Sequence, residues 1–229
     1  MEVTAFHAPV IEQNDDVFEI FCQVVSSLKE EDIICIASKV VAYEQGRVVA
    51  VQDGDITEIV RQEADEVLSE GKWMLTKKDG CLICNAGVDN SNVQEGFVVL
   101  WPKNPWKWAE EFHKKLQDKF KLKKLGVVIT DSRCAPSRRG VTGFALAWGG
   151  FGGIIDERGK KDLFGNEIQV TQRNVADSIA DSATLLMGET NEATPFAVVR
   201  EAPVDFTNET IDPNLVRISK KEDLFRKIL

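Results

Sequence analysis

Apolar side chains recur every three or four positions in four stretches of the chain, which is the spacing of an amphipathic helix. The first stretch follows Asn14, Asp15 and Asp16, which predict an N-cap with acidic residues in the first turn. The third follows Asn104 and Pro105, a cap and a first-turn proline. The fourth is so rich in Ala and Leu that we expect it to be deeply buried, within one subunit or between two. The expected helices span residues 17–28, 57–68, 106–121 and 172–187.

Short, continuous apolar runs lie between these helices and predict buried strands. Strands and helices alternate irregularly, and several expected strands are neighbours in sequence. This order favours an α+β fold with mixed or antiparallel sheets and flanking helices over a simple doubly wound sheet. Without an internal repeat or a clear linker, we expect one domain over residues 1–229, or two intimately packed lobes. The expected strands span residues 33–37, 72–76, 81–86, 97–101, 127–130, 167–171 and 196–200.

Composition and charge restrict the classes of protein that fit the chain. It has 229 residues, of which 43% are hydrophobic and 28% charged, as is ordinary for a globular protein. The net charge of −9 leaves no basic surface for nucleic acid or an anionic membrane. The N-terminal residues lack the pattern of a signal peptide, and no apolar stretch is long enough to span a membrane. We therefore expect a cytoplasmic protein without nucleic-acid or membrane partners.

The five cysteines include one CxxC pair, Cys81 and Cys84. Zinc or thiol exchange would be the functional interpretation of this pair. A second CxxC is missing, and the chain has only two histidines. The pattern therefore favours small apolar residues in a strand.

Residues 126–159 read GVVITDSRCAPSRRGVTGFALAWGGFGGIIDERG, an apolar run that ends in Asp131 and Ser132 and leads to Arg138 and Arg139. Eight of the 16 glycines lie between Gly140 and Gly165. Such clustering predicts backbone turns that a Cβ forbids, or backbone close to a ligand. A carboxylate beside hydroxyl, guanidinium and N–H groups suits a metal-bound phosphate.

An acidic residue follows each of three apolar segments. These residues are Asp89, Asp131, which has the hydroxyl of Ser132 beside it, and Glu189. Oxygen ligands of this kind suit Mg²⁺ or Mn²⁺, although each residue alone also fits a cap or a turn. Other catalytic patterns fit less well. The chain has no GxxxxGK[ST] loop and too few histidines in suitable places for a Ser-His-Asp triad. Cys134 also lacks an arginine at the spacing of a phosphate-binding cysteine loop.

Five segments, in their order and spacing, resemble the coenzyme F420-0:L-glutamate ligase family of γ-glutamyl ligases. The resemblance extends over residues 9–200. The segments are SKVVAYEQGRVV from Ser38, AGVDNSN from Ala86, VVITDS from Val127, DERGKKDLFGNEIQVTQRNVADSIADSATLLMGE from Asp156 and TPFAVVR from Thr194.

The resemblance implies a reaction in which a nucleoside triphosphate, normally GTP, activates a carboxylate that is then joined to L-glutamate. It implies Mg²⁺ or Mn²⁺, with K⁺ as an additional cation, and the family fold with an intertwined homodimer. The implied metal ligands are Asp89, Asp131, Ser132 and Glu189. The implied nucleotide contacts are Pro9, Val10, Ile11, Ser38, Lys39, Asn92, Met187, Gly188 and Thr190. Besides Asp131, the catalytic candidates are Arg138 and Arg139, with Arg158 as an alternative, because guanidinium groups match phosphate and carboxylate groups.

Two departures from the family pattern concern the substrates. Tyr43 stands where the family usually has a second basic residue, and residues 134–137 read CAPS instead of Gly-Arg-Pro-Trp. The altered pattern is closer to bacterial relatives proposed to act on folates. The sequence therefore predicts a γ-glutamyl ligase acting on a folate or on coenzyme F420-0, with GTP or ATP. The alternatives are an inactive relative that binds a nucleotide or folate, and a metal-dependent phosphate-ester hydrolase.

Overall fold

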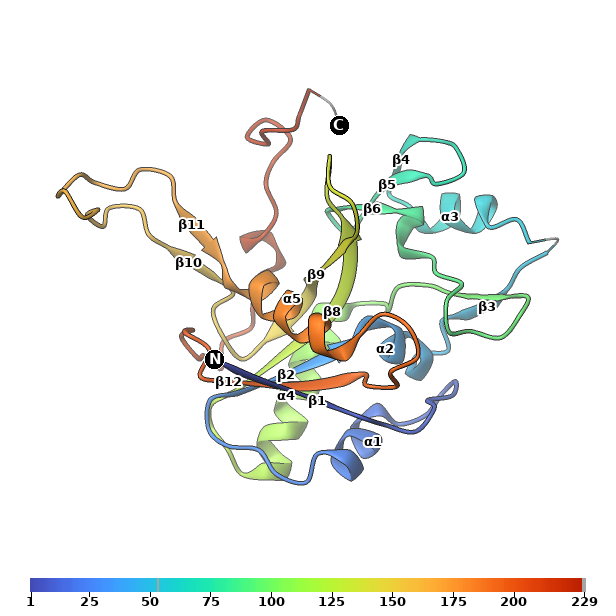
Figure 1. Ribbon diagram of the computed structural model, residues 1–229, viewed down its shortest axis with the longest axis horizontal. Helices are drawn as coiled ribbons and strands as arrows, with labels where there is room; N and C mark the ends of the chain where they lie inside the picture. Colours follow the sequence, from blue (N-terminus) through green and yellow to red (C-terminus); the bar gives the residue numbers. More distant parts are fainter. Residues whose placement is uncertain (53, 228–229) are drawn as a thin grey trace.

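A five-stranded mixed sheet forms the centre of the computed structural model, which describes residues 1–52 and 54–227 (Figure 1). The strand order is β1-β12-β2-β8-β9, in which β2 and β8 are parallel and the other neighbours antiparallel. Strand β2 and the first half of β8 are apolar and buried on both faces, as is typical of central strands covered by helices. The strands are β1 (Glu2–Phe6), β2 (Asp32–Ala37), β8 (Leu125–Cys134), β9 (Val141–Gly149) and β12 (Phe196–Arg200).

Helices cover both faces of this sheet. On one face, α1 (Val17–Val24) and α4 (Pro105–Phe120) pack against Ile34 and Ile36 of β2. On the other face, α5 (Val175–Met187) packs against Ile33 and Cys35. Alternate residues of one strand therefore belong to two cores, and each fully buried aliphatic side chain stabilises the fold by roughly 1.5–3 kcal/mol. The helices lie on opposite sides of the sheet in Figure 1.

Two smaller sheets and α3 (Thr57–Glu63) form a second unit beside the central sheet, with its own apolar cluster around Val60, Met74 and Val98. The short helix α2 (Ser38–Glu44) connects β2 to this unit. Its sheets contain β3 (Val48–Ala50) with β7 (Phe97–Val99), and β4 (Glu66–Ser69), β5 (Leu75–Lys78) and β6 (Cys81–Cys84), followed by the 3₁₀ turn η1 (Asn85–Gly87). Cys81 and Cys84 thus lie on a strand, as predicted.

A long hairpin that contains β10 (Ile154–Asp156) and β11 (Gln172–Asn174) projects from the body of the molecule (Figure 1). Leu163, Phe164 and Val170 of this arm are strongly exposed. The C-terminal segment contains the 3₁₀ turn η2 (Pro213–Leu215). Within the described part of the chain, no helix combines the length and the apolar character that a membrane crossing needs.

Several predicted helices have shorter bounds in the structure. Asp16 caps α1 by accepting hydrogen bonds from the amides of Phe18 and Glu19, as predicted, but the helix ends at Val24. Helix α3 ends at Glu63, because Val67 pairs with Thr76 in a sheet instead of continuing the helix. Helix α4 starts at Pro105, yet within the described chain its Asn104 makes no side-chain cap hydrogen bond.

Three predictions about strands were wrong in position. The strand expected at residues 72–76 is β5 at Leu75–Lys78, so it begins three residues later than predicted. Residues 167–171 contain only an isolated bridge from Glu167 to Lys161, and the regular strand β11 begins at Gln172, where it pairs with β10. Asp131 and Ser132 do not follow a strand but lie within β8. The reason is β9, which pairs with β8 as far as Cys134 and keeps the backbone extended.

The clustered glycines serve close packing and turns. A Cβ on Gly143 would lie 2.7 Å from the Asp181 Cα and 2.9 Å from the Ala180 carbonyl oxygen of α5. Gly150 has a φ of +88°, and a Cβ there would lie 2.1 Å from the Leu125 carbonyl oxygen. None of the described glycines from 140 to 165 lines the large cavity described below. Gly143 and Gly150 therefore fit the first predicted use, backbone that turns or packs where a Cβ would clash.

Candidate active site

A cavity of about 970 Å³ opens where the central sheet meets the second unit. Four separate parts of the chain form its walls: the turn after β1, the start of α2, the segment from η1 to β7, and the loop after α5. Residues 130–132, within β8, also line it. All the residues predicted to bind metal or nucleotide line this cavity: Pro9, Val10, Ile11, Ser38, Lys39, Asp89, Asn92, Asp131, Ser132, Met187, Gly188, Glu189 and Thr190.

The parallel pair β2 and β8 creates the inner wall of the cavity. Their pairing ends at Ala37 and Thr130, beyond which β2 turns into α2 while β8 continues. One edge of β8 therefore loses its neighbour just before Asp131. Carboxyl ends of parallel strands are a common location of ligand sites, because adjacent chains diverge there. Here the divergence brings the Ser38 hydroxyl to Asp131, where it donates a hydrogen bond of 3.0 Å to Oδ2.

Asp131 is a desolvated carboxylate with two hydrogen-bond donors beside it. Burial raises the pKa of Asp131 to about 6, and the nearby negative charge of Asp89 acts in the same direction. Hydrogen bonds from the Ser132 amide and the Ser38 hydroxyl partly offset this effect. The Ser132 amide donates to Oδ1 over 2.7 Å. The site thus holds a carboxylate whose negative charge is only partly compensated by the protein.

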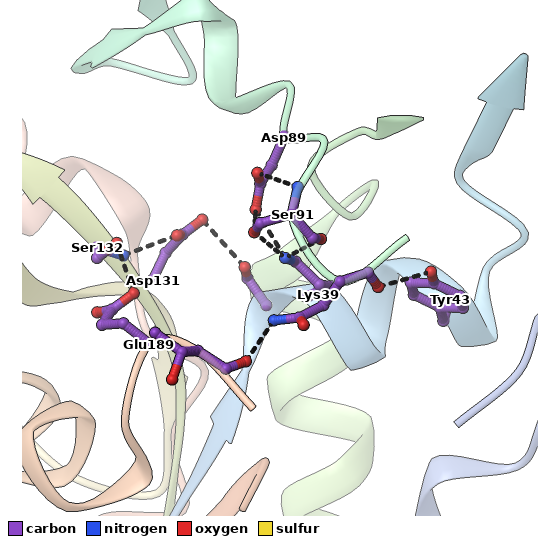
Figure 2. A network of polar contacts seen from close by, with 10 residues as sticks. Lys39, Tyr43, Asp89, Ser91, Asp131, Ser132 and Glu189 are labelled. Carbon is purple, nitrogen blue, oxygen red and sulfur yellow. Dashed lines mark hydrogen bonds and ion pairs between the residues drawn. The ribbon is translucent and has the colours of Figure 1, made fainter. Parts of the chain in front are cut away.

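Asp89, on the facing wall, is fully engaged (Figure 2). Its Oδ1 accepts from the Ser91 amide over 2.8 Å, and its Oδ2 accepts from the Ser91 hydroxyl and from Lys39 Nζ, each over 2.7 Å. Burial opposes ionisation, but Lys39 and Ser91 outweigh it and hold the pKa of Asp89 below its usual value. Lys39 also donates to the Ser91 carbonyl oxygen over 2.7 Å, so its ammonium group contacts both Asp89 and Ser91.

Glu189 follows α5 directly and approaches Asp131 from the third side. The Ser132 hydroxyl donates to Glu189 Oε2 over 3.4 Å, a long and weak hydrogen bond. Burial raises the pKa of Glu189, and the negative charges of Asp89 and Glu192 add to this rise. Ser132 therefore stands between two carboxylates, one from a strand and one from a loop.

The oxygen donors on these walls fit a hard divalent cation. Among residues 1–52 and 54–227, no three Asp, Glu, His or Cys side chains form a preassembled metal cluster. Mg²⁺ does not need one, because it binds one or two carboxylates and takes its other ligands from water and substrate phosphates. Asp131 and Glu189 are destabilised as anions by burial and by neighbouring charge, which a cation between them would relieve.

A hydrogen bond across the mouth of the cavity connects two of its walls. The Asn92 amide donates to the Thr190 carbonyl oxygen over 2.6 Å, so the loop after η1 meets the loop after α5. The Tyr43 hydroxyl donates to the Asn92 carbonyl oxygen over 3.3 Å. Glu192 in turn accepts from the Thr190 amide and hydroxyl over 2.8 and 3.0 Å.

Arg138 and Arg139 are not brought to these carboxylates. Both lie in the exposed turn between β8 and β9 and are outside the described lining of the cavity. Arg158 lies on the projecting arm, where it makes hydrogen bonds to Asp156.

Sequence reasoning did not single out Ser91, Trp101 or Glu192. The order Asp89, Asn90, Ser91 is a signal for a turn in which an aspartate accepts from the backbone two residues on, and it could have indicated Ser91. No local signal distinguishes Trp101 from any other apolar residue at the end of a strand.

Comparisons with known proteins agree on one family. A family model described as F420-0:Gamma-glutamyl ligase matches residues 5–201. A protein of Methanococcus maripaludis named coenzyme F420:L-glutamate ligase is 35% identical, over 99% of this chain and 97% of its own length. Proteins of the same name from Methanocaldococcus jannaschii and Archaeoglobus fulgidus are 32% and 35% identical. These alignments cover 99% and 96% of this chain and 97% and 94% of the relatives.

Proposed function

The chain belongs to the F420-0:gamma-glutamyl ligase family, and from this premise we propose that it is a nucleotide- and metal-dependent γ-glutamyl ligase. It joins L-glutamate through an amide to the carboxylate of coenzyme F420-0 or of a folate. The observation that carries the proposal is the single cavity in which the metal and nucleotide residues implied by the family meet. Its volume of about 970 Å³ is at the upper end of ordinary ligand sites and leaves room for a nucleotide and part of an acceptor.

The proposed reaction has two steps, phosphoryl transfer to the acceptor and then amide formation. The acceptor carboxylate attacks the γ-phosphorus of GTP or ATP, the bond to the β-phosphate oxygen breaks, and an acyl phosphate and a nucleoside diphosphate result. The amine of L-glutamate then attacks the acyl carbon, loses a proton and expels inorganic phosphate. Both steps place negative charge on phosphate oxygens, so positioning and charge stabilisation account for most of the catalysis.

The carboxylates and hydroxyl on the cavity walls are proposed to hold Mg²⁺ or Mn²⁺. When bound, the cation spreads the charge of the transferring phosphoryl group. The proposed ligands are Asp89, Asp131, Ser132 and Glu189. Lys39, next to them, supplies an ammonium group that can leave Asp89 for a nucleotide phosphate. K⁺ is proposed as an additional cation.

The proposed nucleotide contacts lie on the turn at residues 9–11 and on the loop at residues 187–190, both of which line the cavity. The choice between GTP and ATP is tested by titration calorimetry with each nucleotide, with and without Mg²⁺. The proposed role of Arg138 and Arg139 at the substrate carboxylates requires the hairpin turn to close over the cavity, or a second subunit to present it.

A homodimer is part of the proposal. Leu163 and Phe164 on the arm are 100% and 90% exposed, and Leu185 on α5 is 81% exposed. Apolar side chains exposed to this extent are typical of surfaces that another chain covers. Light scattering after size exclusion should give twice the chain mass, and Phe164→Asp should shift the mass towards that of the monomer.

The function is tested by mass spectrometry of products after incubation with L-glutamate, Mg²⁺, either nucleotide and either acceptor. We expect an acceptor that is heavier by one or more glutamyl residues, and phosphate release only when glutamate and acceptor are both present. Phosphate release without glutamate would indicate a hydrolase instead. Nucleotide binding without any turnover would indicate an inactive binding relative.

A further inference from the structure

The loop after α5 carries two of the residues that are proposed to act in the cavity, Glu189 and Thr190. The start of this loop is anchored, because the Gly188 amide donates to the Thr184 carbonyl oxygen over 2.9 Å and ends the helix. Residues 189–192 are all exposed. Their conformation therefore depends on contacts within the loop and on contacts across the cavity, rather than on burial in a core.

The Glu192 side chain turns back over this loop and binds Thr190 twice. Its Oε2 accepts from the Thr190 amide over 2.8 Å, and its Oε1 accepts from the Thr190 hydroxyl over 3.0 Å. The negative charge on these oxygens makes each hydrogen bond stronger than one between neutral groups. One carboxylate thus binds the backbone and the side chain of Thr190 together and restrains both.

Gly188 provides the space for this carboxylate. A Cβ on Gly188 would lie 2.3 Å from Glu192 Cδ and 2.5 Å from Oε2. Gly188 also has a φ of +79°, which residues with a side chain rarely adopt. The Glu192 carboxylate therefore packs directly on bare backbone, next to the residue that precedes Glu189.

The loop that Glu192 restrains faces two other walls of the cavity. The Thr190 carbonyl oxygen accepts from the Asn92 side-chain amide over 2.6 Å. Glu189 Oε2 accepts from the Ser132 hydroxyl over 3.4 Å. One short loop thus sets the position of a carboxylate beside β8 and of a carbonyl group at the mouth of the cavity.

We propose that Glu192 is a positioning residue, which holds the loop in the conformation that presents Glu189 and Thr190 to the cavity. The inference rests on the proposed function, because it assumes that these two residues bind the cation and the nucleotide. A loop that adopts the binding conformation only part of the time lowers the apparent affinity by that fraction. Loss of the restraint should therefore weaken nucleotide binding by about 10-fold.

Two substitutions of Glu192 separate positioning from charge. Glu192→Ala removes both acceptors. Glu192→Gln removes the charge but keeps an oxygen that accepts from the Thr190 amide, and the Thr190 hydroxyl can rotate to accept from the new side-chain amide. A positioning role predicts that glutamine restores most of the affinity that alanine loses. A direct role as a charged ligand or a base predicts that both variants lose it alike.

Glu95 provides a matched control. It is an exposed glutamate on the segment between η1 and β7, and it lies outside the described lining of the cavity. Glu95→Ala and Glu95→Gln change the net charge and the side-chain size as the substitutions of Glu192 do. Removing a negative charge favours an anionic nucleotide, so weaker binding in Glu192→Ala is opposite to the general effect of charge.

The restraint itself is tested by amide hydrogen exchange of the ligand-free protein, with mass spectrometry of fragments that contain residues 188–192. We expect exchange about 10-fold faster in Glu192→Ala, because the Thr190 amide loses its acceptor, and exchange close to that of the wild type in Glu192→Gln. Both Glu95 variants should exchange like the wild type in these fragments. Unchanged exchange in Glu192→Ala would overturn the proposal.

The consequence is tested by titration calorimetry with GTP and with ATP in the presence of Mg²⁺. We expect about 10-fold weaker binding in Glu192→Ala, a loss of less than about 3-fold in Glu192→Gln and wild-type binding in the Glu95 variants. Equal losses in the two Glu192 variants, or wild-type affinity in Glu192→Ala, would refute the positioning role alone. A wild-type protein that binds neither nucleotide would instead refute the proposed function, and this inference with it.

Thermal unfolding shows whether each variant is folded. If Glu192→Ala does not fold, Thr190→Val replaces it, because this substitution removes the hydroxyl hydrogen bond and leaves Glu192 in place. Faster exchange of residues 188–192 in that variant supports the proposal, and wild-type exchange refutes it.

Discussion

Two walls of one cavity carry an aspartate each, and the protein treats the two carboxylates in opposite ways. Asp131 on β8 has a raised pKa because burial is only partly offset by neutral donors. Asp89 on the facing loop has a lowered pKa because the Lys39 ammonium and Ser91 outweigh burial. A full positive charge at 2.7 Å is what distinguishes the two environments.

The first turn of α2 serves both walls. Ser38 donates to Asp131, and its neighbour Lys39 pairs with Asp89. Successive residues of a helix point in different directions, so the side chains of one helical turn can contact both walls of the cavity. The charge of Asp89 is therefore balanced by Lys39, whereas Asp131 on β8 has no cationic side chain paired with it among the described residues. This difference predicts that the affinity for a divalent cation depends mainly on Asp131. It also predicts that nucleotide phosphates compete with Asp89 for the Lys39 ammonium.

The largest effect is expected from Asp131→Asn. The substitution keeps the size of the side chain but removes the charge that a cation needs, so ligation should fall by about 100-fold or more. The measurement is phosphate release in the presence of glutamate, acceptor and saturating nucleotide. Asp156→Asn on the arm is the control and should retain activity, since Asp156 lies outside the described cavity lining. Full activity of Asp131→Asn would show that the charge of Asp131 is not needed for ligation, and the proposed difference between Asp131 and Asp89 would then be wrong.

The second effect concerns pH. Only ionised Asp131 binds a cation, and its pKa is raised to about 6, so Mn²⁺ affinity should fall as pH drops through that value. One competing proton corresponds to about a 10-fold loss at about pH 5 relative to about pH 7.5. The raised pKa of Glu189 acts in the same direction, whereas Asp89, with a lowered pKa, stays ionised over this range.

This prediction is checked by Mn²⁺ titration in buffers between about pH 5 and pH 8. An affinity that stays constant across this range would mean that the cation does not depend on Asp131. In Asp131→Asn, any Mn²⁺ binding that remains should vary less with pH than in the wild type.

The third effect is expected from Lys39→Met, which keeps the length of the side chain and removes the ammonium. Nucleotide affinity should fall by about 10-fold, because a direct charge on the phosphates is lost. Calorimetry with GTP and ATP measures it, and Lys103→Met, outside the described lining of the cavity, is the control. Unchanged nucleotide affinity would show that Lys39 serves Asp89 alone.

The sequence predicted the α+β class, the central apolar strands and α4, because each depends on a continuous or periodic apolar pattern in adjacent residues. It did not predict α2. Ser38 and Lys39 mark the end of the apolar run of β2, but the helix that begins there has only seven residues, too few for a helical period to be recognised in the sequence.

The meeting of the site residues was expected only through the family resemblance. Asp89 and Asp131 lie in different units of the fold, and local sequence carries no information on how two units pack. The place of Asp131 within a strand depends on pairing with β9, which is again a contact between distant residues. The pairing of Lys39 with Asp89 was missed for the same reason.

The smallest effects are expected on the free energy of unfolding, which Asp131→Asn and Asp89→Asn should change in opposite directions. The pKa of Asp131 is raised on folding, so the charged form opposes folding, and stability is lost as pH rises through about 6. Asp131→Asn should therefore raise the free energy of unfolding at about pH 7.5, by on the order of 1 kcal/mol, with a smaller gain at about pH 5.

Asp89→Asn should act in the opposite direction at about pH 7.5. The pKa of Asp89 is lowered on folding, so its charge stabilises the folded state above the ordinary pKa of 3.8. The loss should be below about 1 kcal/mol, because the carboxylate is partly exposed and solvent screens its ion pair with Lys39. Urea unfolding in the presence of a chelator measures both variants. Changes of the same sign would mean that Lys39 does not distinguish the two walls, because both carboxylates would then contribute alike to stability.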